Sequence, residues 1–358
     1  MNRNVLSRRG IAGVALAAVA AIALAGCNKS DDSGNSTSSA PSNALASLSG
    51  ELKASGASFP AAFYQEVIAE AKTVAPNLKV TYNSVGSGTG KKEFGTGLVD
   101  FAGTDSTVKD ADGVKFPFYY IPTVSAPITV SYNLKGVTSL QLSPDTVAKI
   151  FQRDIKAWNA PEIAADNPGV TLPSTAITVA HRSDASGTTN NFTKYLVAAS
   201  PAWKLNTGDT VNWPTDTVGG AQNTGVATVI KQNDGGIGYV DLSDAKAASL
   251  TFASIKNKAG KFAQPSLDGV TAALGGAKVN DDLTYDPLNT AGETAYPIAA
   301  PTYLIVKQKY DDAAKAKLVK EFIKYILGDG AALAKDVNFA TLPDSLKSKA
   351  LAQLDKVS

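Results

Sequence analysis

Residues 176–199 read AITVAHRSDASGTTNNFTKYLVAA, and they point to one class of fold. The first five are apolar or β-branched, which predicts a buried strand, while apolar residues recur at helical spacing over 190–199. A strand that turns directly into a helix is the repeating unit of α/β proteins. The same alternation continues along the chain and predicts an α/β fold with mainly parallel sheets.

The turn between this strand and this helix has the chemistry of an anion site. It contains a guanidinium, a carboxylate, two hydroxyls and a glycine, in the order Arg182, Asp184, Ser186, Gly187 and Thr188. The first N–H groups of a helix have no intrahelical partner and lie at the positive end of the helix dipole. A lone Ser-Gly-Thr is often only a helix cap. Beside Arg182 and Asp184, it indicates a site for an oxyanion.

The N-terminal residues resemble a bacterial lipoprotein signal peptide. Three arginines precede an apolar stretch over 11–25, which is too short to cross a membrane and is followed by Cys27, the only cysteine. The resemblance implies that residues 1–26 are removed and that lipid on Cys27 anchors the protein to a membrane, in the periplasm or at the cell surface. The Ser- and Asn-rich residues up to 48 are then expected to form a flexible tether.

The composition excludes several classes of function. Without residues 1–26 the chain has 31 basic and 32 acidic side chains, because that segment contains three arginines and no acid. A nucleic-acid partner is not expected, because it needs a clustered basic face. One cysteine and one histidine exclude internal disulfides and Cys- or His-rich metal sites. We therefore expect a monomer with no cofactor and no metal.

About 310 residues follow the tether, more than one core usually holds, so we expect two lobes. Helices are predicted over 60–74, 91–97, 143–151, 190–199, 225–233 and 311–327. Strands are predicted over 78–83, 100–104, 119–132, 176–180, 236–240 and 300–306. In such folds, ligands bind at the carboxyl ends of strands, where loops lead into helices.

Three further segments carry groups suited to an oxyanion. Ser58 precedes the first predicted helix and is expected to cap it, which leaves the N–H groups of Ser58 and Phe59 facing outward. The glycine-rich loop over 86–90 contains Ser87, and Asp105 follows a predicted strand. Alone, each feature is typical of an ordinary cap, turn or surface acid. Together they favour one shared site.

Five segments resemble, in order, the phosphate-binding protein of bacterial phosphate ABC transporters. They are GASFP at 56–60, VDFAGTD at 99–105, RSDASGT at 182–188, IGYV at 237–240 and LPDS at 342–345. Weaker matches, IKAW at 155–158 and WP at 213–214, lie between them. The resemblance implies a two-lobed, type II periplasmic binding protein fold that closes on one inorganic phosphate. The partner it implies is the permease and ATPase complex of an importer in the cytoplasmic membrane.

The resemblance also implies two crossings between the lobes, near residues 121–132 and 296–303. Lobe 1 is then expected to contain residues 49–125 and 300–358, and lobe 2 residues 126–299, with an antiparallel strand among the parallel ones.

The family's site can be carried over position by position. Ser58 and Phe59 would donate backbone N–H groups, and the Ser58 hydroxyl and Ser87 would add further bonds. Asp105 would be the acceptor, and Arg182 would be the phosphate-binding arginine, held in place by Asp184. Donors at a helix terminus would come from Ser186, Gly187 and Thr188. The family often has threonine where this chain has Ser58. It often has GSSGG where this chain has GSGTG, which leaves the roles of Gly88 and Thr89 open.

Asp105 would choose between anions, because an ionised carboxylate can only accept a hydrogen bond. Hydrogen phosphate carries a proton to donate at neutral pH, whereas sulfate does not. A site built around such a required bond discriminates by roughly 10⁴–10⁵. The alternative ligands within the binding class are sulfate, molybdate and arsenate, and arsenate shares the shape and the proton of phosphate.

Two enzyme hypotheses are weaker. His181, Asp184 and Ser186 are the residue types of a hydrolase or phosphatase triad, but His181 should point to the other face of the strand from Arg182, and no nucleophile-elbow glycine precedes Ser186. The loop over 86–92 is one residue short of a phosphate-binding loop of nucleotide enzymes. We therefore expect a binding protein without catalytic residues. A surface phosphate sensor or adhesin with the same fold is a further alternative.

Overall fold

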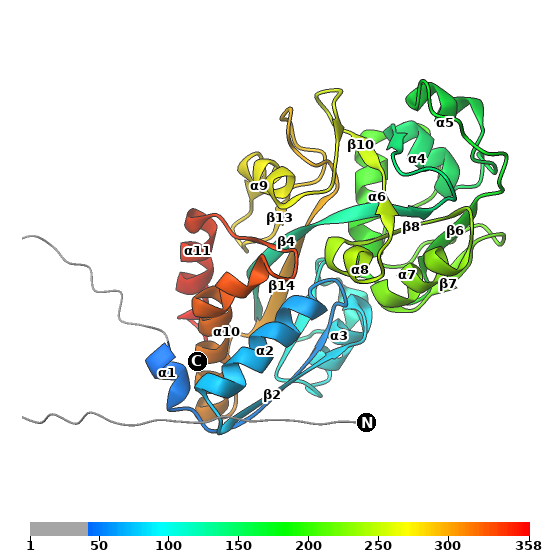
Figure 1. Ribbon diagram of the computed structural model, residues 1–358. Coiled ribbons are helices and arrows are strands. Elements are labelled where there is room, and N and C mark those ends of the chain that lie inside the picture. Colours follow the sequence, from blue (N-terminus) through cyan, green and yellow to red (C-terminus); the bar gives the residue numbers. More distant parts are fainter. Residues whose placement is uncertain (1–41) are drawn as a thin grey trace, which may run out of the picture. The chain divides into compact units, whose positions relative to one another are not determined.

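The computed structural model describes residues 42–358, so the expected signal peptide, Cys27 and most of the tether lie outside the described residues. One large sheet runs through both lobes of this part of the chain (Figure 1). Its strands follow the order β2-β1-β3-β14-β4-β8-β6-β7, and β9 and β15 also pair with β4. Their bounds are β1 Gly50–Gly56, β2 Leu78–Ser84, β3 Phe101–Thr104, β4 Phe118–Asn133, β6 Thr178–Arg182, β7 Val218–Gly220, β8 Gly236–Asp241, β9 Thr251–Phe252, β14 Ala299–Lys307 and β15 Ala340–Thr341.

Each lobe has the same strand pattern. In lobe 1, β2, β1 and β3 are parallel, and β14 joins them antiparallel. In lobe 2, β7, β6 and β8 are parallel, and β4 joins them antiparallel. Parallel strands buried on both faces need long apolar runs, and all six residues of β8 are buried. The α/β prediction, with mainly parallel sheets and an antiparallel strand, is confirmed.

The long strands β4 and β14 connect the lobes. The first part of β4 pairs with β14 as far as Pro127, and from Ile128 onward β4 pairs with β8 in the other lobe. The change of partner lies close to the expected crossing over 121–132. The lobe boundaries themselves stay a prediction.

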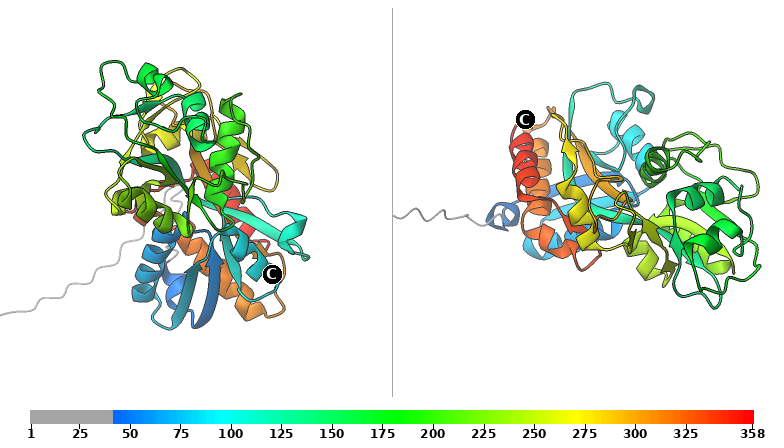
Figure 2. Two further views of the ribbon diagram at one scale, coloured as in Figure 1. Left: turned by 90° about the vertical axis from the view of Figure 1, so that its right-hand side faces the viewer. Right: turned by 90° about the horizontal axis from the view of Figure 1, so that it is seen from above.

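Helices cover the faces of this sheet (Figures 1 and 2). They are α2 Ala61–Val74, α3 Ser87–Gly95, α4 Pro144–Phe151, α5 Pro161–Asp166, α6 Gly187–Ala199, α7 Gln222–Gln232, α8 Leu242–Ala247, α9 Leu267–Gly275, α10 Ala313–Leu327 and α11 Asp344–Leu354. Short strands complete the fold: β5 Gln141–Leu142, β10 Ser254–Lys256 and β11 Phe262–Ala263 form one small sheet, and β12 Lys278–Val279 and β13 Tyr285–Asp286 form another. Helix α10 ends at Gly328, as the sequence predicts.

Three predicted boundaries near the anion site are wrong by a few residues. Helix α3 begins at Ser87 rather than at residue 91, because Gly86 takes a φ of 88° and turns the chain directly into the helix. Helix α7 begins at Gln222 rather than 225. Strand β6 runs to Arg182, two residues beyond the predicted end, so Arg182 lies at the carboxyl end of a strand.

The last residues of the predicted tether belong instead to the folded protein. Residues 42–46 form the short helix α1, and the side chains of Leu45 and Leu48 are buried in the core. The sequence interpretation missed this because two leucines among serines and asparagines show no periodicity. Over 42–358, the helices all fall short of the length and apolarity required to cross a bilayer.

Candidate functional site

Arg182 is the centre of a buried polar cluster in lobe 2. Its side chain is only 1% exposed, and the two carboxylate oxygens of Asp184 accept from one edge of its guanidinium, with Nε–Oδ1 at 2.8 Å and Nη2–Oδ2 at 2.5 Å. Burial raises the pKa of Asp184, but the hydrogen bonds and charge of Arg182 outweigh it and hold that pKa below its usual value. The bidentate pair fixes the plane of the guanidinium. This arrangement is the supporting role that the sequence assigned to Asp184.

Two further residues join this cluster that the sequence interpretation missed. Asn223, fully buried at the start of α7, accepts from Nη1 of Arg182 at 3.2 Å and donates through Nδ2 to the hydroxyl of Thr188 at 3.3 Å. Gln222 has a φ of 60° and donates its backbone N–H to Asp184 at 3.0 Å. The available signal was position, since α7 begins just after the carboxyl end of the parallel strand β7.

Helix α6 presents its N-terminus to lobe 1. Ser186 is its N-cap, with the hydroxyl accepting from the N–H of Thr189 at 3.2 Å, and Gly187 and Thr188 form the first turn. Gly187 lies directly against Asp105 and Ser87, because a Cβ at this position would lie 2.6 Å from the Cβ of Asp105 and from the Ser87 hydroxyl. A side chain at Gly187 would therefore hold the two lobes apart.

Asp105 and Ser87 form the lobe 1 side of the site. Asp105 is 3% exposed, accepts from the Thr302 hydroxyl at 2.8 Å through Oδ1, and lies 3.4 Å from the Ser87 hydroxyl through Oδ2. Burial raises the pKa of Asp105 to about 7, although the Thr302 bond and the charge of Arg182 oppose it. The sequence-based prediction assumes an ionised Asp105, and burial disfavours that form in the phosphate-free protein.

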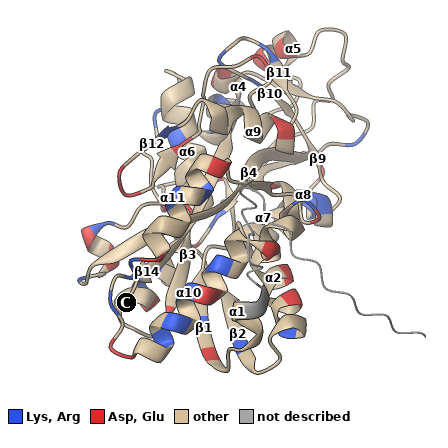
Figure 3. Cartoon of the chain, turned by 90° about the vertical axis from the view of Figure 1, so that its left-hand side faces the viewer, with Lys and Arg blue, Asp and Glu red and all other residues tan. Residues whose placement is uncertain are grey.

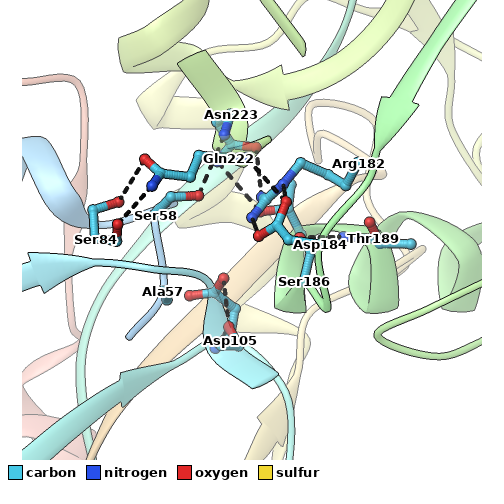
Figure 4. Close-up of polar contacts among 12 residues, drawn as sticks. Ala57, Ser58, Ser84, Asp105, Arg182, Asp184, Ser186, Thr189, Gln222 and Asn223 are labelled. Atoms are coloured by element: carbon cyan, nitrogen blue, oxygen red, sulfur yellow. Dashed lines mark hydrogen bonds and ion pairs between the residues drawn. The ribbon is translucent and has the colours of Figure 1, made fainter. Parts of the chain in front are cut away.

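Ser58 differs from its predicted local role. Helix α2 has Pro60 as its N-cap and no side-chain cap, so the prediction that Ser58 caps this helix is wrong. Its hydroxyl instead accepts from the backbone N–H of Asn223 at 3.3 Å, across the two lobes (Figure 4). The neighbouring Phe59 packs its ring against Phe339, with centroids 5.8 Å apart. Only the backbone of Phe59 can therefore face a ligand.

Further bonds between the lobes surround the site. Gln222 donates to the carbonyl of Ser84 at 2.6 Å and accepts from its hydroxyl at 3.2 Å. Asn191 donates to the carbonyl of Asp105 at 2.6 Å. On the same side, Lys91 and Asp209 form an ion pair at 2.9 Å in which the lysine side chain is 1% exposed. The described lobes are thus in contact around the predicted anion residues.

The structure brings the predicted residues together in one place. In Figure 4, Asp105 lies opposite the group formed by Ser58, Asn223 and Arg182. A cavity of about 380 Å³ adjoins Asp105 on another side, where Ser106, Asn190 and Tyr303 line it, and Asp105 is the one proposed site residue in its lining. The site offers hydroxyl, guanidinium and helix-terminus donors with one titratable acceptor. Such a set suits a small oxyanion that can share a proton with Asp105.

His181 does not join this site as a base. Its ring stacks on Trp213 with centroids 5.1 Å apart, and Nδ1 lies 2.9 Å from the carbonyl oxygen of Arg182. Burial lowers its pKa, which favours the neutral ring.

Over the described residues, groups of three or more side chains suited to a metal ion are absent. On the face drawn in Figure 3, positive and negative side chains are interspersed rather than gathered in a basic patch.

Comparison with known proteins places the chain in a family. The model of the PBP superfamily domain matches residues 41–330. The phosphate-binding protein PstS of Methanocaldococcus jannaschii is 35% identical over 87% of this chain and 86% of its own length. The phosphate-binding protein PstS of Xylella fastidiosa strain 9a5c is 32% identical over 91% and 92%. Phosphate-binding protein PstS 2 of Mycobacterium tuberculosis is 33% identical over 98% and 99%.

A solved structure shares the fold. The periplasmic phosphate-binding protein PfluDING, bound with phosphate, superposes with a TM-score of 0.71 and 24% identity, over 85% of this chain and 93% of that one. Because a superfamily model and relatives above 30% identity both extend over most of its length, the chain belongs to the PstS family of phosphate-binding proteins.

Proposed function

We propose that this chain binds one inorganic phosphate between its lobes and delivers it to the permease and ATPase complex of an ABC-type importer. Membership of the PstS family supports phosphate as the ligand. The observation that supports the location is the meeting of Arg182, Thr188 and Ser58 around Asn223, opposite Asp105. Ser87, Ser186, Gly187 and the backbone of Phe59 complete the proposed ligand set, with Asp184 holding Arg182.

Charge balance within the site favours hydrogen-bond recognition over attraction. Asp184 neutralises Arg182, and an ionised Asp105 adds a negative charge. Binding of a dianion therefore depends on local donors, chiefly the guanidinium, the hydroxyls and the first N–H groups of α6. Arsenate satisfies the same donors and carries the same proton, so it is the second ligand that the site would accept.

The pKa of Asp105 makes anion choice depend on pH. Above about pH 7 the ionised carboxylate accepts a hydrogen bond from hydrogen phosphate and repels unprotonated sulfate. Below that pH, Asp105 carries a proton of its own and can donate to sulfate. Calorimetry at about pH 8 should show tight phosphate binding and negligible sulfate binding, while sulfate should gain affinity toward pH 5.5. Equal affinities for the two anions at pH 8 would refute the role of Asp105.

A binding protein rather than an enzyme is proposed because His181 is stacked away from Ser186. A chromogenic phosphate ester provides the test. We expect no turnover, whereas turnover that the Ser186→Ala substitution abolishes would establish a phosphatase.

Lipid attachment at Cys27 is proposed from the sequence alone. A lipid anchor would keep the protein on the outer side of a membrane, within reach of its importer. Labelling of cells with a fatty acid analogue should mark the protein, and Cys27→Ser should remove the label and release the protein into the soluble fraction. An unlabelled wild-type protein would contradict the anchor. We also propose that the protein acts as a monomer, which sedimentation of the purified protein can check.

A further inference from the structure

Asn223 forms hydrogen bonds with three of the proposed phosphate-binding residues. It is fully buried, and its side chain and backbone bond to Arg182, Thr188 and Ser58. We propose that Asn223 is a positioning residue that directs the hydroxyls of Thr188 and Ser58 to donate hydrogen bonds to the bound anion. This inference rests on the proposed function, because it deepens the chemistry of the same site.

The orientation of the Asn223 amide follows from its neighbours. Nη1 of Arg182 lies 3.2 Å from one end of the amide, and a guanidinium can only donate. That end must therefore be the oxygen Oδ1. The other end is then Nδ2, which lies 3.3 Å from the Thr188 hydroxyl and can only donate to it. Arg182 thus fixes the amide, and the amide faces Thr188 as a donor.

The hydroxyl of Thr188 can still donate one hydrogen bond. The hydroxyl oxygen lies within reach of two donors, Nδ2 of Asn223 at 3.3 Å and Nη1 of Arg182 at 3.4 Å. A hydroxyl has two lone pairs and one proton, so two donors occupy its accepting capacity. Its proton is then directed to a third partner. For a residue in the first turn of α6, that partner is an anion at the helix terminus.

Asn223 also donates a hydrogen bond to the hydroxyl of Ser58, in the opposite lobe. The backbone N–H of Asn223 donates to its hydroxyl at 3.3 Å, which leaves the Ser58 proton for another acceptor. Asn223 belongs to lobe 2 and Ser58 to lobe 1, so this bond forms only when the lobes are together. Asn223 therefore donates to a hydroxyl in each lobe, through its side chain to Thr188 and through its backbone to Ser58.

Hydrogen bonds of Gln222 fix the backbone immediately before Asn223. Gln222 adopts a φ of 60°, a conformation that favours glycine. This conformation costs free energy, and it persists only where the surrounding structure holds it. Three bonds do so: one from its N–H to Asp184 and two between its side chain and Ser84. The strained residue is thus fastened to both lobes immediately before the positioning residue.

A double-mutant cycle on phosphate affinity tests this proposal. In the full chain freed of bound phosphate, Asn223→Ala should weaken phosphate binding about tenfold or more in calorimetry, which is the usual coupling of contacting polar groups. In a Thr188→Val background, the same change should weaken binding less than about threefold, because the hydroxyl that it orients is already gone. Equal losses in both backgrounds would overturn the proposal.

Two further variants separate positioning from folding. Asn223→Leu keeps the branched outline of the side chain without its polar atoms, and it repeats the cycle if the alanine variant does not fold. Asn223→Asp replaces the donor by an acceptor, so Thr188 would turn its proton away from the anion, and this variant should bind phosphate more weakly than Asn223→Leu. An aspartate variant that binds as well as the leucine variant would overturn the proposed direction of the hydroxyl.

Asn233→Ala is the matched control. Asn233 is the C-cap of α7, at the opposite end of this helix from Asn223, and its side chain donates to the carbonyl of Val229 at 2.7 Å. Its loss should leave phosphate affinity unchanged. If wild type and Asn233→Ala both fail to bind phosphate, the proposed function fails. If they bind and the cycle is additive, only the role of Asn223 fails.

Discussion

Replacing Asp105 by asparagine should stabilise the phosphate-free protein, and the gain should grow with pH. The side chain is 3% exposed, and burial raises its pKa from 3.8 to about 7. Thr302 and Ser87 hydrogen-bond to it, Arg182 lowers its pKa, and Asp209 raises it. Asparagine has nearly the same shape, can accept from Thr302 and carries no charge to bury. The change therefore removes mainly the cost of ionising a buried acid.

The size of the effect follows from the pKa. Between pH 3.8 and about 7 the folded state holds a proton on Asp105 that the unfolded state has released. Stability then falls as pH rises, by about 1.4 kcal/mol for each pH unit. Over this window the wild type should lose on the order of 4 kcal/mol relative to Asp105→Asn. Below pH 3.8 both states are protonated and the carboxyl adds no such difference.

Urea unfolding at several pH values measures this difference. Phosphate must first be removed, for example by refolding from denaturant, because bound ligand stabilises the folded state by mass action. The stability of Asp105→Asn minus that of the wild type should rise from near zero at about pH 4 to its maximum above pH 7. Asp216→Asn is the control: a bond from Arg153 lowers the pKa of this exposed acid, so its difference should run the other way. A difference for Asp105→Asn that stays flat from pH 4 to 8 would refute the assignment of a raised pKa.

Two other substitutions probe the contacts between the lobes. Gln222→Ala removes both side-chain bonds to Ser84 and should speed phosphate release several-fold in stopped-flow measurements, with a smaller effect on association; an unchanged release rate would show that these bonds do not hold the closed state. Lys91→Met leaves Asp112 and Asp209 without the ammonium 2.9 Å from each, and should destabilise the protein by about 3–5 kcal/mol in urea unfolding. Adding Asp209→Asn should recover part of this loss, and no recovery would argue against a direct pairing.

Local patterns in the sequence were sufficient to predict most elements near the site. The strand before Arg182 and the helix after Gly187 follow from β-branched and helical periodicity. Boundaries were less accurate where glycine lets the chain turn, as at Gly86, or where a residue adopts an unusual conformation, as at Gln222. The strand over 50–56 and the helix over 344–354 were not predicted, because the first, GELKASG, has no β-branched residue and only one large apolar side chain, and the second has only a weak apolar stripe.

Site residues that belong to a recognisable motif could be predicted. Residues that hydrogen-bond to them from a distant segment of the chain could not. Thr302 bonds to Asp105 from 197 positions further along the chain, and Asn223 bonds to Ser58 across 165 positions. Nothing local marks either residue, because each acts only through a partner that the fold brings near. The protonation of Asp105 is a similar case, since desolvation is set by all the surrounding segments together.

The sequence by itself determined the alternation of strands and helices, the anion chemistry of residues 182–188 and the family resemblance, because each can be read from short segments taken one at a time. Only the tertiary structure decided that Ser58 accepts from Asn223 rather than capping a helix, that Gly187 must remain without a side chain, and that burial raises the pKa of Asp105. These features arise where two lobes meet. Hydrogen-bond direction, close approach and burial all depend on atoms that are distant along the chain.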